Sequence, residues 1–126
     1  QGRLSNLQQL GPIGMANARS AAMLSPQAAP ALQEAVRETM AQIDPAGYTQ
    51  AVQMLGQGRL AQDLKNWSGP LLIASGEADT VTPPAACDAL AHDVAQARIS
   101  LGPVGHACPL EADAAVNQLL GLPLLI

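Results

Sequence analysis

LLIASGEADTVTPP, at residues 71–84, is the stretch that decides the fold. Its first four residues are all apolar with no polar alternation, which is typical of a parallel strand covered on both faces. Gly76 ends this run, and Asp79 follows three residues later in a loop. Functional groups in open α/β sheets collect beyond the carboxyl ends of the strands. Asp79 therefore stands where a functional carboxylate is expected.

A second segment, GHACPLE at residues 105–111, places a histidine in the matching position. It follows a strand candidate in which Ile99 and Leu101 flank Ser100, and it precedes a helix. The 27-residue offset from Asp79 to His106 is what one more helix and one more strand would occupy. The two side chains then lie at adjacent strand ends, as the acid and base of a nucleophile–acid–base triad do. We predict a hydrogen bond of about 2.6–3.2 Å between them.

Other interpretations of the same residues remain open. Asp79 has the setting of a solvated turn aspartate, and His106 that of a helix-capping or surface histidine. Glu77 is a competing carboxylate, but its place directly after a glycine favours solvent. Cys108 follows His106 closely, yet neighbours on a strand-to-helix turn seldom point at one another, so we do not assign it as a nucleophile. Cys87 has the helical spacing of a small buried hydrophobe.

The segment before residue 66 has helical periodicity. We expect a helix over residues 13–24, ended by Ser25-Pro26, because the residue before a proline avoids the helical region. A second helix from Pro30 carries an apolar stripe, and a third begins with Asp44 as N-cap. The stripes are Leu32, Val36, Met40 and Ile43 in the second helix, and Tyr48, Val52 and Leu55 in the third.

From Pro70 the pattern changes to alternating strands and helices. We expect a strand at residues 71–74 and then a helix capped by Thr82, with Ala86, Leu90 and Val94 facing its core. A strand at residues 99–101 and a helix from Pro109 to Gly121 follow. The sequence thus predicts an α/β fold with two parallel strands, divided into a helical segment at 1–66 and a β-α-β-α segment at 67–126.

Composition excludes several classes of protein. The 126 residues suit one domain, with no Phe, one Trp and one Tyr, so aliphatic side chains must fill the core. The net charge is −4 with six scattered cations, which gives no footprint for nucleic acid. No apolar run approaches the ~20 residues of a membrane span. We expect no membrane partner, no metal or other cofactor, and a cytoplasmic location.

The nucleophile of the triad is missing from the sequence. No Gly-x-Ser-x-Gly motif occurs, and none of the serines has the strand–turn–helix context of a nucleophile elbow. These serines are Ser5, Ser20, Ser25, Ser68, Ser75 and Ser100. We therefore assign no nucleophile and expect the chain to be the carboxyl-terminal piece of a larger enzyme.

The stretch from Asp44 to Leu120 resembles the carboxyl-terminal half of an α/β-hydrolase. GEADTVTP at 76–83 resembles the acid loop of that family, and Gly105-His106 resembles its histidine loop. MAQIDPAGY at 40–48 resembles lid segments of one branch of the family, the 3-oxoadipate enol-lactonases and ring-cleavage-product hydrolases. The resemblance implies a partial α/β-hydrolase fold: a helical lid followed by the last two parallel strands and their helices. It also implies that Asp79 is the triad acid and His106 the base.

Two functions follow as hypotheses. In the first, the chain belongs to a serine-type hydrolase that cleaves an ester, a lactone or an activated C–C bond of a small substrate. Apolar lid residues would line the cavity, namely Met40, Tyr48, Val52, Met54 and Leu55. A complementary amino-terminal half, or another copy of the chain, would be its partner, and the chain alone would be inactive. In the second, the chain is a non-catalytic, hydrolase-like binding or scaffold module.

Overall fold

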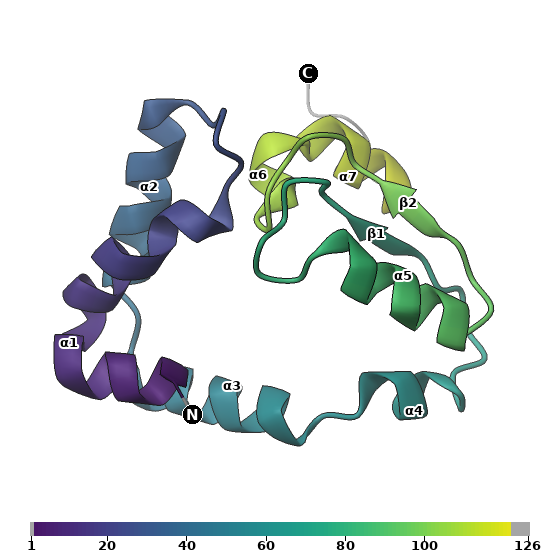
Figure 1. Cartoon of the computed structure of the whole chain (residues 1–126), viewed down its shortest axis with the longest axis horizontal. Coiled ribbons are helices and arrows are strands. Elements are labelled where there is room, and N and C mark those ends of the chain that lie inside the picture. Colours follow the sequence, from purple (N-terminus) through teal and green to yellow (C-terminus); the bar gives the residue numbers. More distant parts are fainter. Residues whose placement is uncertain (1, 122–126) are drawn as a thin grey trace. The chain divides into compact units, whose positions relative to one another are not determined.

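The computed structural model describes residues 2–121, which form two compact units (Figure 1). The first unit comprises residues 1–21 and 29–60 and is helical. The second comprises residues 22–28 and 61–126 and holds the strands. Residues 22–28 therefore belong with the carboxyl-terminal part of the chain, although they lie between two helices of the first unit in sequence. No helix among residues 2–121 is long and apolar enough to cross a membrane.

The first unit consists of α1 (Gly2–Arg19), which contacts both α2 (Pro30–Ala41) and α3 (Pro45–Gln57). The short helix η1 (Ser20–Met23) follows α1, and its last two residues belong to the second unit. Gly11 interrupts α1 with a φ of 65°, a conformation that glycine adopts without steric cost. The sequence predicted a helix over 13–24 only, so the turns before Gly11 were missed and the end was placed too late. Leu7, in the turns before Gly11, is buried. Those turns are helical because the packing of apolar side chains supplies most of the stability of a helix in a protein.

The predicted starts of α2 and α3 are confirmed, but α2 ends at Ala41, so Ile43 lies outside the helix to whose stripe the sequence assigned it. Val36 is buried in the stripe of α2, and Pro45 occupies the first turn of α3. Asp44 caps α3 by accepting a hydrogen bond from the backbone N–H of Gly47 at 2.6 Å. That bond satisfies one of the N–H groups that a helix leaves without a partner at its start.

Replacing Asp44 with alanine should lower the free energy of unfolding by about 1 kcal/mol, because the first turn of α3 loses its acceptor. Urea unfolding followed by circular dichroism measures the change. Asp44→Asn should restore most of the loss, since an amide oxygen also accepts the Gly47 N–H. If Asp44→Ala is as stable as the wild type, the cap contributes nothing.

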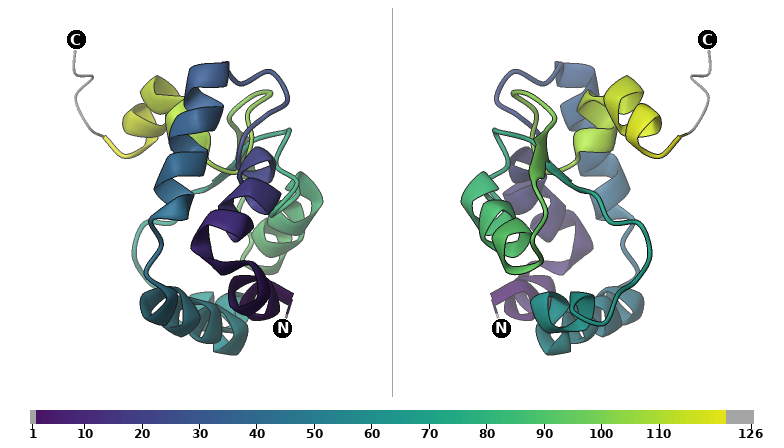
Figure 2. Two further views of the ribbon diagram at one scale, coloured as in Figure 1. Left: turned by 90° about the vertical axis from the view of Figure 1, so that its left-hand side faces the viewer. Right: turned by 90° about the vertical axis from the view of Figure 1, so that its right-hand side faces the viewer.

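The second unit contains a two-stranded parallel sheet between helices. β1 (Ile73–Ser75) pairs with β2 (Arg98–Ser100) in the register Ile73–Arg98, Ala74–Ile99 and Ser75–Ser100. The short α4 (Leu60–Leu64) precedes β1, and α5 (Pro84–Asp93) connects the two strands. α6 (Cys108–Glu111) and α7 (Asp113–Leu119) lie on the side of the sheet opposite α5 (Figures 1 and 2). The predicted parallel pairing is confirmed.

Several details of the second unit differ from prediction. The first strand begins at Ile73 rather than Leu71, because pairing with β2 starts there, and Leu72 is 60 % exposed. α5 begins after Pro83 rather than Thr82, whose N–H instead donates to Asp79. Ala91, and not Ala86, is its buried residue. The last helix divides into α6 and α7 at Ala112, where φ is −137° and ψ is 45°.

Candidate active site

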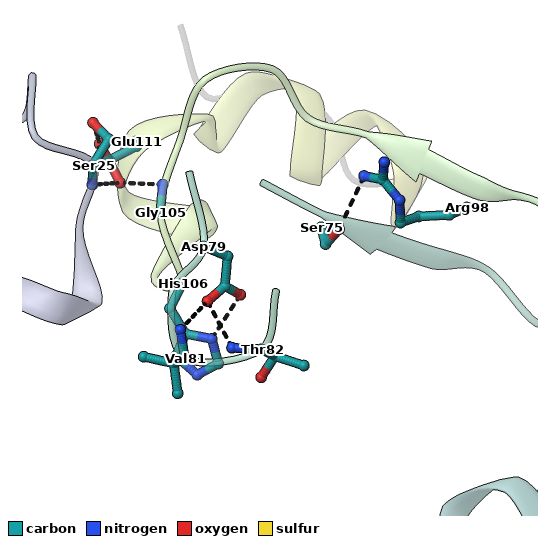
Figure 3. A network of polar contacts seen from close by, with 9 residues as sticks. All are labelled: Ser25, Ser75, Asp79, Val81, Thr82, Arg98, Gly105, His106 and Glu111. Atoms are coloured by element: carbon teal, nitrogen blue, oxygen red, sulfur yellow. Dashed lines mark hydrogen bonds and ion pairs between the residues drawn. The ribbon is translucent and has the colours of Figure 1, made fainter. Parts of the chain in front are cut away.

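Asp79 lies in the loop after β1 and is held by the backbone of that loop (Figure 3). It is only 7 % exposed, and its Oδ1 accepts hydrogen bonds from the N–H groups of Val81 and Thr82, both at 2.8 Å. Burial opposes ionisation of this carboxyl, but the hydrogen bonds from Thr82, His106 and Val81 outweigh it and lower the pKa of Asp79. The carboxylate is therefore ionised and fixed, with Oδ2 free to face another group.

His106 lies in the loop between β2 and α6 and meets that second oxygen (Figure 3). Its Nδ1 is 2.9 Å from Oδ2 of Asp79, so the predicted contact is present. A carboxylate can only accept, so Nδ1 carries the proton in this pair. The His106 side chain is 38 % exposed, and Nε2 has no partner among residues 2–121. The unprotonated Nε2 of a neutral ring is then available to accept a proton from elsewhere.

Backbone hydrogen bonds between the two loops bring Asp79 and His106 together. The N–H of Glu77 donates to the carbonyl of Gly102 at 2.9 Å, and the N–H of Ala78 donates to the carbonyl of Val104 at 3.0 Å. Gly76 permits this approach: a Cβ there would lie 2.0 Å from the Val104 carbonyl oxygen. The acid loop and the histidine loop thus form one hydrogen-bonded layer beyond the sheet.

The competing residues take structural roles. Glu77 is exposed and pairs at 3.0 Å with Arg98 of β2, which also binds Asp88 of α5 and the hydroxyl of Ser75. Cys108 is a free thiol whose pKa is raised by burial and by the charges of Asp79 and Glu111. A raised pKa disfavours the reactive thiolate. Within residues 2–121, no group of three or more His, Cys, Asp or Glu side chains has the arrangement of a metal site.

The predicted lining residues all belong to the helical unit, whereas Asp79 and His106 belong to the other unit. Met40 lies on α2, half-buried, and the other four lie on α3. Tyr48 and Val52 are half-buried, while Met54 and Leu55 are about two-thirds exposed, at 67 % and 65 %. Val52 and Leu55 line a shallow surface pocket together with Arg3 and Gly56. Their role as substrate contacts stays a prediction.

Sequence reasoning missed one residue of the site, Glu111. Its carboxylate accepts hydrogen bonds from the N–H of Gly105, next to His106, and from Ser25 (Figure 3). The signal was a single carboxylate five residues after the histidine in an otherwise uncharged segment, GHACPLE. Its partner Ser25 lies 86 residues earlier in the chain, so local pattern could not reveal the contact.

The lowered pKa of Asp79 makes a stability prediction. A carboxyl whose pKa is lower in the folded state stabilises that state above its unfolded value, here 3.8, and loses the contribution as the pH falls through the folded pKa. The stability difference between wild type and Asp79→Asn should therefore be largest well above pH 3.8 and shrink below it. Urea unfolding of both proteins across this range measures it. A difference independent of pH would contradict the ionised state of Asp79.

Comparison with known proteins gives a fold but no family. No family model matches, and no curated protein matches the sequence. Among solved structures, the chain is similar to a thermophilic esterase from Thermogutta terrifontis, solved with malate bound, at a TM-score of 0.80 and 22 % sequence identity. The similarity covers 95 % of this chain and 46 % of the esterase chain, so this chain spans about half the length of that enzyme. The likeness supports an α/β-hydrolase-like fold for these helices and the parallel sheet.

Proposed function

We propose that this chain supplies the acid and the base of a serine-type α/β-hydrolase that cleaves small esters. The observation that carries the proposal is the Asp79–His106 pair, 2.9 Å apart on successive loops beyond two parallel strands, in a fold similar to that of an esterase. The pair has the chemistry that ester cleavage requires: a buried, ionised acid fixes the tautomer of an imidazole whose other nitrogen is available.

In the proposed mechanism, a serine from outside this sequence attacks the substrate carbonyl and forms an acyl-enzyme. Nε2 of His106 accepts the serine proton. It returns this proton to the oxygen of the leaving alcohol as the single bond between that oxygen and the acyl carbon breaks. The same nitrogen then activates a water molecule that releases the acyl group and regenerates the serine. Asp79 stabilises the imidazolium that forms in each half of the cycle.

We propose that a complementary amino-terminal half supplies the nucleophile and the next strand of the sheet. Within the described residues, β1 pairs along one edge only, with β2, and such an open edge is a template for another strand. Two exposed leucines, Leu72 and Leu120, also line an apolar groove of about 230 Å³ in this unit, together with the half-buried Ala74. A second copy of the chain is the alternative occupant.

We propose that the substrate is small and partly apolar, and that the bond cleaved is an ester. The alternatives are a lactone and an activated C–C bond. The similarity of residues 40–48 to lid segments supports the branch of 3-oxoadipate enol-lactonases and ring-cleavage-product hydrolases. The apolar side chains of α2 and α3, from Met40 to Leu55, would shape the cavity. Residues 1–66 would then act as the lid and residues 67–126 as part of the core.

The test is to assay hydrolysis of an activated ester by residues 1–126 alone and together with the segment encoded directly upstream of Gln1. The chain alone should be inactive, because no nucleophile elbow or oxyanion donors are assigned to it. Adding the upstream segment should give activity and raise the mass in solution by one copy of that segment. Activity in the isolated, monomeric chain would show that its nucleophile has been missed. An inactive complex with no serine at the elbow would favour the binding or scaffold module.

A further inference from the structure

Glu111 of α6 connects three parts of the second unit through one carboxylate (Figure 3). Its Oε2 accepts hydrogen bonds from the N–H of Gly105 at 2.8 Å and from the N–H of Ser25 at 3.0 Å. Its Oε1 accepts from the hydroxyl of Ser25 at 2.5 Å and, at 3.2 Å, from the Ser25 N–H. Each of these hydrogen bonds comes from a neutral donor, and each donor needs an acceptor.

These hydrogen bonds fix the charge state of Glu111. Burial disfavours the ionised form, but the donors of Ser25 and Gly105 outweigh that effect and lower the pKa of the Glu111 carboxyl. A carboxylate offers about four lone-pair sites, enough to accept all of these bonds. A glutamine side chain would replace one of the two oxygens with an NH₂ group, which cannot accept a hydrogen bond from Ser25 or Gly105. The site therefore selects a carboxylate rather than a neutral side chain of the same shape.

The backbone on either side of His106 is anchored by this cluster. Gly105 donates to Glu111, and Ala107 donates its N–H to the carbonyl of Met23 at 2.7 Å. The chain at Leu24 and Ser25 passes so close that a Cβ on Gly105 would lie 2.4 Å from the Leu24 carbonyl carbon. Among residues 2–121, the His106 side chain has a single hydrogen-bond partner, Asp79. The orientation of its ring thus depends on the two anchored neighbours.

We propose that Glu111 is the positioning residue of the acid–base pair, holding the His106 loop through Gly105 and Ser25 so that Nδ1 meets Asp79. Its catalytic consequence rests on the proposed hydrolase function, whereas the positioning itself does not. We call the hydrogen-bonded cluster of Glu111, Gly105 and Ser25 the clamp; Ser25 belongs to it because its hydroxyl donates to Glu111. A loosened clamp lets the imidazole leave the acid while the sheet and helices stay folded.

The experiment uses the whole chain with isotope-labelled histidine and follows ring N–H exchange with water by NMR. The chain has two histidines, and the His92 side chain is 91 % exposed, so it serves as an internal reference. In the wild type, the Nδ1–H of His106 should exchange more slowly than that of His92. Glu111→Gln should accelerate the His106 exchange by about tenfold, the effect of losing one net hydrogen bond. Glu38→Gln, at an exposed position of α2, should leave it unchanged.

Unfolding is separated from loss of positioning by circular dichroism and by a second variant. Glu111→Asp keeps the charge but shortens the side chain, so it should also accelerate the His106 exchange, to a smaller extent. Wild-type exchange in a folded Glu111→Gln protein overturns the proposal. If that variant does not fold, wild-type exchange in Glu111→Asp overturns it.

In the ester-cleaving assembly, Glu111→Gln should lower kcat by about 10²-fold with KM unchanged, as a misplaced catalytic group does. A protein that cleaves no ester but shows the predicted exchange rates would refute the proposed function and leave the positioning role intact. An active protein in which Glu111→Gln keeps both the kcat and the exchange rate of the wild type would refute the positioning role alone.

Discussion

Replacing Asp79 with asparagine should leave the chain folded and lower kcat for ester cleavage by a factor on the order of 10⁴. The asparagine amide can donate to Nδ1 of His106, which favours the tautomer with the proton on Nε2. That nitrogen then cannot accept a proton from the nucleophile. The measurement compares the kcat and KM of both proteins in the presence of the upstream segment.

The matched control for this variant is Asp63→Asn, which makes the same change at an exposed position of α4. It should keep the wild-type rate. A wild-type rate in Asp79→Asn as well would mean that another acid serves the histidine, and the assignment of the triad would fall. A variant that loses folding along with activity would instead give Asp79 a mainly structural role, through its bonds to Val81 and Thr82.

Replacing Gly76 with alanine should destabilise the chain by about 3 kcal/mol, at the upper end for overpacking. The added Cβ would lie 2.0 Å from the Val104 carbonyl oxygen and 2.7 Å from its carbonyl carbon, and backbone atoms cannot rotate away as a side chain does. The two loops must then separate, which breaks the hydrogen bonds of Glu77 and Ala78. Urea unfolding measures the loss.

Gly56→Ala is the control, because nothing lies within 4 Å of a Cβ at that position of α3. There the substitution should stabilise the chain by up to about 1 kcal/mol, since alanine is the better helix former. Equal stability of Gly76→Ala and wild type would show that the loops approach less closely than described. The Nδ1–H of His106 should also exchange faster in Gly76→Ala, as its acid partner is displaced.

The sequence was most informative where a pattern is local. The 3.6-residue stripe of α2, the Asp44 cap and the apolar run before Gly76 each depend on residues a few positions apart, and each predicted an element that the structure contains. The contact of Asp79 with His106 was also within reach. Parallel strands end at the same edge of a sheet, so two loops that follow adjacent strands must be neighbours.

The features that the sequence did not reveal depend on distant contacts. The turns before Gly11 are helical because Leu7 is buried in the helical unit, and the local sequence pattern predicted a helix from residue 13 only. Thr82 does not cap α5, because the N-cap position falls one residue later, on Pro83. The clamp of Glu111 joins residues 86 positions apart, and a single serine and a single glutamate carry no periodic signal.

The order of the segments in the chain limits how this protein can be divided. Residues 22–28 are encoded inside the helical half but belong to the unit with the sheet. A truncation that begins at residue 61 would keep Asp79 and His106 and remove Met23, Leu24 and Ser25. Glu111 would lose two of its three donor groups, and the amide of Ala107 would lose its acceptor. The helical unit therefore cannot be removed by truncation at residue 61 without the loss of contacts that support the histidine loop.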